Sequence, residues 1–295
     1  MILEVDRVCK TFGPIRAVQN ISASIPKGCI SGFLGPNGAG KTTLIRMIMD
    51  ILKPDRGTIS LADGLEGSRK NHIGYLPEER GLYTKAKVRD TLIYFARLKG
   101  LSKADAMANA DDFLERLSMT ATADMAIGKL SKGNQQKIQL ISALVARPDL
   151  LILDEPFSGL DPVNVKMVSD LLVSLRDGGT SILLSTHQMN QAETFCSHIF
   201  LINKGQLILQ GELEPIIDQY SGNCLVVSAS FPLPESQLYT VLSVEGGRHK
   251  IRLNEGVSRR DLMGELAGLD QDIESLAPYR VPLSDIFIQE VAAHE

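Results

Sequence analysis

The sequence contains no tryptophan, no CxxC pair and no apolar run approaching the roughly 20 residues that a membrane-spanning helix needs. Its four cysteines are widely spaced, and its N-terminus does not resemble a secretion signal. We therefore expect a reduced, cytoplasmic setting. If the protein works at a membrane, we expect another polypeptide to cross it. The cysteines are Cys9, Cys29, Cys196 and Cys224.

The sequence also has no excess of basic charge. It contains 31 Lys and Arg and 35 Asp and Glu, which give a formal net charge of −4. Proteins that bind nucleic acid over a broad surface are typically basic, so the totals predict no nucleic-acid partner, although local patches stay open. The length of 295 residues predicts one large domain and a smaller one.

Strand and helix patterns alternate over most of residues 1–222, which predicts an α/β domain with a mostly parallel sheet. Two β segments near the N-terminus, 2–13 and 16–25, are joined by a Gly-Pro turn. From about residue 80 to 147 the spacing is helical instead, so we predict a helical insertion. The pattern restarts near Gly222, and we predict a small α+β domain over residues 223–295.

The segment GPNGAGKTT, residues 35–43, follows a predicted buried strand and opens a predicted helix. Glycines let backbone N–H groups point at phosphate oxygens, and the helix adds its positive end. Lys41 is expected to reach the β- and γ-phosphates, and Thr42 to ligate Mg²⁺. A glycine-rich loop without a nucleotide is the weaker alternative. The candidate binding residues are Gly35, Pro36, Asn37, Gly38, Ala39, Gly40, Lys41, Thr42 and Thr43.

A second candidate segment, LLILDEP, is an apolar strand that ends in two acids. Asp154 is expected to hold Mg²⁺, usually through water, and Glu155 to orient or deprotonate the water that attacks the γ-phosphate. Strands often end in an acid at a solvent edge. This segment therefore depends on the phosphate-binding loop upstream for its interpretation.

A third segment, LSKGNQQKIQL at residues 130–140, is predicted to start a helix with Ser131 as its cap. It carries no general base, metal-ligand cluster or nucleophile in an obvious setting. A helix N-terminus with a serine, a glycine and a lysine is also suited to bind an anion. The segment can therefore be a cap alone or half of a phosphate site.

Four motifs, GPNGAGKTT, LSKGNQQ, LLILDEPFSGLDP and LLSTHQM, occur in an order and at separations that resemble the nucleotide-binding subunits of ABC transporters. The resemblance covers about residues 1–220. It implies a P-loop ATPase core of this family, made of a mostly parallel sheet with an antiparallel β subdomain and an inserted α-helical subdomain. It also implies ATP and Mg²⁺ as ligands.

The family resemblance further implies partners and a location. Its ATP sites form between two nucleotide-binding subunits, so we expect a dimer, with two copies of this chain as the first choice. A separate multi-span membrane permease would carry the substrate. The chain would then be peripheral, on the cytoplasmic face of the cell membrane.

Matching positions receive roles from the same resemblance. Phe12 looks like the aromatic residue that stacks on adenine, with a buried core position as the alternative. Asp161 looks like the acid that communicates between subunits, and it can also cap the helix before Pro162. His187 looks like the histidine that contacts the γ-phosphate. Ser131 and Gly133 would close over the γ-phosphate held by the opposing subunit.

Two departures from the family pattern stand out. The family normally has a Gln where this chain has Glu78, so we expect Glu78 in the catalytic site and near Mg²⁺, with a solvated acidic loop as the alternative. The usual Leu-Ser-Gly-Gly-Gln becomes Leu-Ser-Lys-Gly-Asn. The segment LPEERGLY and the C-terminal extension resemble the sodium- and drug-efflux branch, which pairs with ABC-2 exporter-type membrane subunits.

Three alternative functions remain to be weighed, and two of them are disfavoured. An ABC-type ATPase in DNA repair or translation is disfavoured, because the insertion lacks sustained heptads and the chain holds one cassette. A regulatory cassette that binds ATP without hydrolysis is kept open by Glu78. A small GTPase is disfavoured, because INKG lacks the Asp that guanine recognition would need at Gln206.

Overall fold

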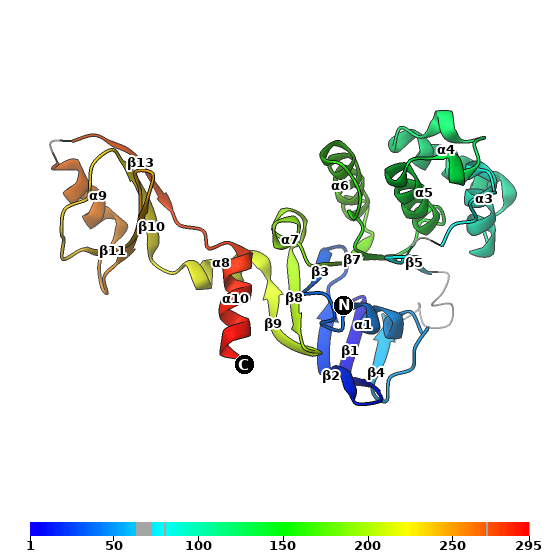
Figure 1. The fold of residues 1–295 in the computed structure, drawn as a ribbon, viewed down its shortest axis with the longest axis horizontal. Coiled ribbons are helices and arrows are strands. Elements are labelled where there is room, and N and C mark those ends of the chain that lie inside the picture. Colours follow the sequence, from blue (N-terminus) through cyan, green and yellow to red (C-terminus); the bar gives the residue numbers. More distant parts are fainter. Residues whose placement is uncertain (63–71, 80, 270, 295) are drawn as a thin grey trace. The chain divides into compact units, whose positions relative to one another are not determined.

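The computed structural model describes residues 1–62, 72–79, 81–269 and 271–294. The chain divides into two compact units, Met1–Leu213 with the residues from Glu290 onward, and Glu214–Gln289 (Figure 1). The division falls at the start of helix α8 (Leu213–Ser221), nine residues of helix that sequence reasoning did not predict. The domain boundary near residue 222 stays a prediction.

The first unit is built on a six-stranded sheet in the order β5-β6-β7-β3-β8-β9. Neighbours from β5 to β8 pair in parallel, and only β9 runs antiparallel. Strands β3, β6 and β7 are buried at every position, as a central parallel strand requires. The predicted α/β sheet is confirmed. Its strands are β5 (Ile73–Leu76), β6 (Leu150–Asp154), β7 (Ser181–Thr186), β3 (Ile30–Leu34), β8 (His198–Asn203) and β9 (Gln206–Glu212).

A second, antiparallel sheet in this unit has the order β2-β1-β4. Its strands are β1 (Leu3–Phe12), β2 (Ile15–Ile25) and β4 (Arg56–Leu61). Leu3 lies opposite Ile25 on one side and Leu61 on the other, so the buried side chains of the three strands share one face. This sheet is the antiparallel β subdomain that the family resemblance implies.

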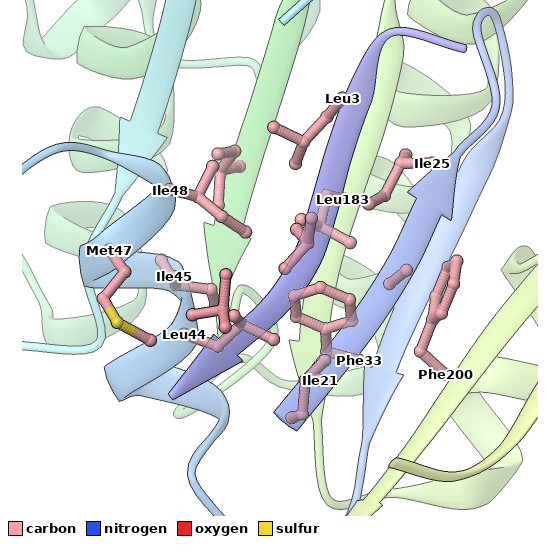
Figure 2. Packing of buried hydrophobic residues seen from close by; sticks show 14 of the residues in the cluster. Leu3, Ile21, Ile25, Phe33, Leu44, Ile45, Met47, Ile48, Leu183 and Phe200 are labelled. Atoms are coloured by element: carbon pink, nitrogen blue, oxygen red, sulfur yellow. The ribbon is translucent and has the colours of Figure 1, made fainter. Parts of the chain in front are cut away.

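Helix α1 (Lys41–Ile48) packs into the core between these two sheets. Figure 2 shows Leu44, Ile45 and Ile48 of α1 directed at side chains from the strands. Phe33 of β3 and Phe200 of β8 meet edge to face, with ring centroids 5.5 Å apart. Because α1 is anchored by four fully buried side chains, its first residue is held in a fixed position after the loop that follows β3.

The predicted helical insertion is formed by α3 (Val88–Leu98), α4 (Lys103–Arg116) and α5 (Lys132–Leu144), which contact one another. The Ser102 hydroxyl caps α4 by accepting a hydrogen bond from the Asp105 N–H at 3.1 Å. Two further helices, α6 (Pro162–Asp177) and α7 (Met189–Phe195), follow β6 and β7. Among the described residues, no helix is both long and apolar enough to cross a membrane.

The second unit is a small α+β structure around an antiparallel sheet in the order β11-β12-β10-β13. The strands are β10 (Cys224–Ala229), β11 (Tyr239–Glu245), β12 (Arg248–Leu253) and β13 (Ile273–Pro278). Helix α9 (Arg259–Ala267) contributes Leu262 and Leu266 to the core of this sheet. Helix α10 (Leu283–Ala293) ends the described chain.

Candidate active site

The loop between β3 and α1 has a backbone that only glycine fits at two positions. Gly35 has φ +148° and Gly40 has φ +105°. A Cβ at Gly35 would lie 2.0 Å from the Ile202 carbonyl oxygen, and one at Gly40 would lie 2.3 Å from that of Ala17. The loop is therefore curled tightly against β2 and β8, and α1 begins directly after it at Lys41.

This loop lines a cavity of about 560 Å³, which lies in the range of small-molecule sites. The Lys41 ammonium group donates hydrogen bonds to the carbonyl oxygens of Gly35 and Pro36, at 2.6 and 2.9 Å. These bonds hold the lysine along the inside of the loop. The lining residues are Ile15, Arg16, Ala17, Asn37, Gly38, Ala39, Gly40, Lys41, Thr42, Thr43, Glu78, Asp154, Glu155, Lys204 and Gly205.

Lys41 is buried, and its burial lowers the pKa of its ammonium group. The charges of Glu155, Asp154 and Glu78 oppose this shift, in that order of size. Three carboxylates that sequence reasoning placed in one site therefore do act on the same cation. Burial thus favours the neutral form of Lys41, and the neighbouring carboxylates favour the charged form that binds phosphate.

Asp154 ends β6 and is almost fully buried. The Ser185 hydroxyl of β7 donates a hydrogen bond to its Oδ1 atom. Within the described chain, its Oδ2 atom has no hydrogen-bond partner. A buried carboxylate oxygen without a donor is costly unless a cation or water meets it. Asp154 and Thr42 line the same cavity, so the two residues fit the hard oxygen-ligand set that Mg²⁺ prefers.

Glu155 follows in a strained conformation, with φ +49°. Its Oε1 atom lies 2.7 Å from Nδ1 of His187 and accepts the backbone N–H of His187 at 3.1 Å. The Glu155 side chain is largely buried, whereas that of His187 is about half exposed. Nδ1 of His187 thus faces the carboxylate, and the pair spans the ends of β6 and β7.

Glu78 lies two residues beyond β5, is exposed and lines the cavity. The Gln139 side chain holds the backbone on either side of it by donating to the carbonyl oxygens of Pro77 and Glu79, at 3.2 and 3.0 Å. The position fits a site residue that is open to solvent. The role of Glu78 stays a prediction.

Seven of the predicted site residues do not line the cavity. They are Phe12, Gly35, Pro36, Ser131, Gly133, Asp161 and His187. Ser131 caps α5 by accepting the Asn134 N–H at 3.3 Å, and Gly133 lies in the first turn of this helix. Asp161 caps α6 by accepting the Asn164 N–H, which confirms the capping interpretation and lowers the pKa of this carboxyl group. Phe12 is 45% exposed at the end of β1, so the core alternative for Phe12 is wrong.

Six residues of the site were missed by sequence reasoning: Ser185 and the cavity-lining Ile15, Arg16, Ala17, Lys204 and Gly205. Ser185 contacts Asp154 from a neighbouring strand, while Arg16 and Lys204 place cationic side chains at the cavity lining. None of them belongs to a motif with fixed spacing. They join the site only through the pairing of strands far apart in sequence.

The site contains a loop that requires glycine at two positions and joins a parallel strand to a helix. A buried lysine and two carboxylates at the end of another parallel strand complete it. This arrangement defines a P-loop nucleoside triphosphatase. The family model described as ABC transporter matches residues 18–158. The chain belongs to the ATP-binding proteins of ABC transporters, and it is an ATP-hydrolysing subunit of this family.

Individual relatives agree with this assignment. The ABC transporter ATP-binding protein YhaQ of Bacillus subtilis (strain 168) is 40% identical over 297 residues, with 99% of each chain covered. Nod factor export ATP-binding protein I of Burkholderia orbicola (strain AU 1054) is 36% identical, with 79% of this chain and 77% of that protein covered. Relatedness over nearly the full chain to a transporter ATP-binding protein disfavours the repair and translation alternatives.

A solved structure shares the fold of the first unit. CbiO1 from Clostridium perfringens, part of the ABC transporter complex CbiONQ, matches with a TM-score of 0.65 and 28% identity. The match covers 74% of this chain and 91% of CbiO1. ATP-binding cassettes of this family bind ATP and ADP, dimerise and work with membrane components.

Proposed function

We propose that two copies of this chain bind Mg–ATP between them and power export through a separate membrane-spanning subunit. The observation that carries the proposal is that the predicted site residues fall into two separate groups. The cavity holds the loop, Lys41, Asp154 and Glu155, whereas Ser131 and Gly133 lie outside it at a helix N-terminus. A second copy would supply that N-terminus to the γ-phosphate.

In this proposal the nucleotide is held by backbone groups and one buried cation. The N–H groups of the loop and the positive end of α1 bind the phosphates, and Lys41 reaches the β- and γ-phosphates. Phe12 stacks on the adenine ring, which its exposure permits. Asp161, at the N-terminus of α6, communicates between the two copies.

Hydrolysis is assigned to Glu155 and His187. The Glu155 carboxylate takes a proton from water as the water oxygen attacks the γ-phosphorus, and the bond to the β–γ bridging oxygen breaks to give ADP and phosphate. His187 holds the carboxylate through Nδ1 and its backbone N–H, and its ring contacts the γ-phosphate.

Thr42 and Asp154 would hold Mg²⁺, with Glu78 as a further ligand or a water-orienting group. When bound, the ion would neutralise charge on the β- and γ-phosphates. The unpartnered Oδ2 atom of Asp154 supports this assignment, since it is aimed at no donor in the described chain.

Export and the membrane partner are inferred from relatives. One is described as an export ATP-binding protein, and a structural neighbour is part of a transporter complex. We infer that the chain sits on the cytoplasmic face of the membrane, bound to a permease, with no nucleic-acid partner. Co-purification of a multi-span membrane protein with the full chain supports the inference, and co-purification of ribosomes or DNA instead contradicts it.

Glu155→Gln tests the assigned chemistry. Glutamine keeps an Oε1 acceptor for both His187 donors, so the local geometry persists, but it cannot take a proton. We expect phosphate release to fall by about 10²- to 10⁴-fold while ATP binding persists and a dimer accumulates in gel filtration. Glu115→Gln, on the exposed surface of α4, is the matched control. Turnover at the wild-type rate in Glu155→Gln would remove Glu155 from the catalytic role.

A further inference from the structure

The turn between β8 and β9 closes one wall of the nucleotide cavity. The Gly205 N–H donates to the Ala39 carbonyl at 2.9 Å, and the Gly205 carbonyl accepts the Gln19 N–H at 2.7 Å. The Gln19 side chain also donates to the Lys204 carbonyl at 2.8 Å. The turn is thus bonded on one side to the phosphate-binding loop and on the other to β2.

The same turn has a strained residue at its tip. Asn203 pairs with Gln206, so Lys204 and Gly205 are the two central residues, with φ +47° and +79°. Positive φ at both central positions defines a type I′ turn, for which Asn-Gly is the preferred pair. Lysine is not among the residue types that adopt this left-handed conformation readily. A strained backbone conformation retained beside a binding cavity calls for a functional explanation.

A second cation stands next to this turn. A Cβ on Gly205 would lie 2.9 Å from the Arg16 carbonyl oxygen, so the turn packs directly on the backbone at Arg16. Arg16 and Lys204 both line the cavity, together with Ala39 and Gly40 of the loop. The cavity therefore carries a cationic wall beside the start of α1.

We propose that Lys204 and Arg16 bind the α- and β-phosphates, the part of the nucleotide that ATP and ADP share. The inference rests on the proposed function, because it takes the cavity as the ATP site. The loop N–H groups cradle the α- and β-phosphates, and the turn is bonded to this part of the loop at Ala39. Lys41 reaches the β- and γ-phosphates from the other side of the loop's phosphate site. The two added cations hold product as firmly as substrate.

The test measures the Kd of ATP and of ADP for the purified full chain by calorimetry. In Lys204→Asn we expect both Kd values to rise by a similar factor, about fivefold, as for an exposed charge contact, and the effect to shrink at high salt. Asparagine suits the type I′ turn, so the melting temperature should not fall. Lys204→Arg should stay near wild type, and Lys53→Asn, at a 79% exposed lysine elsewhere, is the matched control.

Arg16→Gln should raise both Kd values in the same way, and it carries the test if Lys204→Asn does not fold. Unchanged Kd values in both variants would overturn the proposal. A rise confined to ATP would place the cations at the γ-phosphate and would also overturn it. If the wild-type chain bound neither nucleotide, the proposed function itself would have failed instead.

Discussion

The substitution Gly133→Ala distinguishes the two roles considered for the N-terminus of α5, which are a helix cap and half of a phosphate site. A Cβ at Gly133 would meet only Leu160 Cδ2 at 3.7 Å and the Gly159 carbonyl at 3.8 Å, which are ordinary contacts. Because alanine forms helix better than glycine, the substitution should stabilise the isolated chain by about 0.5–1 kcal/mol. For a unit of this size, that corresponds to a rise of about 1–4 °C in melting temperature.

The proposed dimer gives the opposite expectation for function. If Gly133 packs on the γ-phosphate held by the other copy, a methyl group there would obstruct the contact. We expect ATP-dependent dimerisation to weaken at least tenfold, about 1.4 kcal/mol, while the Kd of ATP for the monomer is unchanged. Analytical ultracentrifugation in the Glu155→Gln background measures both states. Gly264→Ala, in helix α9 where a Cβ would meet no atom within 4 Å, is the matched control. A more stable chain that dimerises as before would refute the half-site.

Two more predictions follow from backbone and burial. Gly40→Ala places a Cβ 2.3 Å from a backbone oxygen at φ +105°, so it should cost about 1–3 kcal/mol in unfolding free energy and abolish ATP binding. Gly38→Ala, at φ +79° with no atom within 4 Å of its Cβ, should cost less in the same thermal melts. Burial raises the pKa of Cys196 to about 12, so mass spectrometry should find it unalkylated by iodoacetamide at pH 8 in the native chain and labelled in urea. Since the raised pKa favours the thiol in the fold, its contribution to stability holds below pH 9 and declines as pH rises towards 12. Rapid native labelling of Cys196 would contradict this.

The α/β architecture of the first unit could be predicted because its signals are local. Apolar runs such as residues 150–154 and 181–186 match strands buried at every position, and a glycine-rich loop marks the strand-to-helix junction. Helix α8 was missed although Leu213, Ile216 and Ile217 have helical spacing and are buried. Its nine residues include Pro215, and the apolar pattern is too short to predict a helix.

The site was predictable only where a motif fixes the spacing. The loop, Asp154 and Glu155 were found in this way, and the structure brings them to one cavity. Ser185 carries no such signal, because any serine near a strand end looks alike in sequence. Its contact with Asp154 depends on which strands pair, and that is decided by packing across the sheet.

The turn between β8 and β9 also constrains the order in which the protein can assemble. It joins β2 to residues near position 204, and the Gln19–Lys204 bond spans 185 positions. Contacts this distant in sequence form late, because the loop between them must close first. The chain must therefore leave the ribosome to beyond residue 205 before the phosphate-binding loop can form its hydrogen bond with the turn at Gly205. The wall that this turn gives the cavity is therefore absent until residues 203–206 have been synthesised.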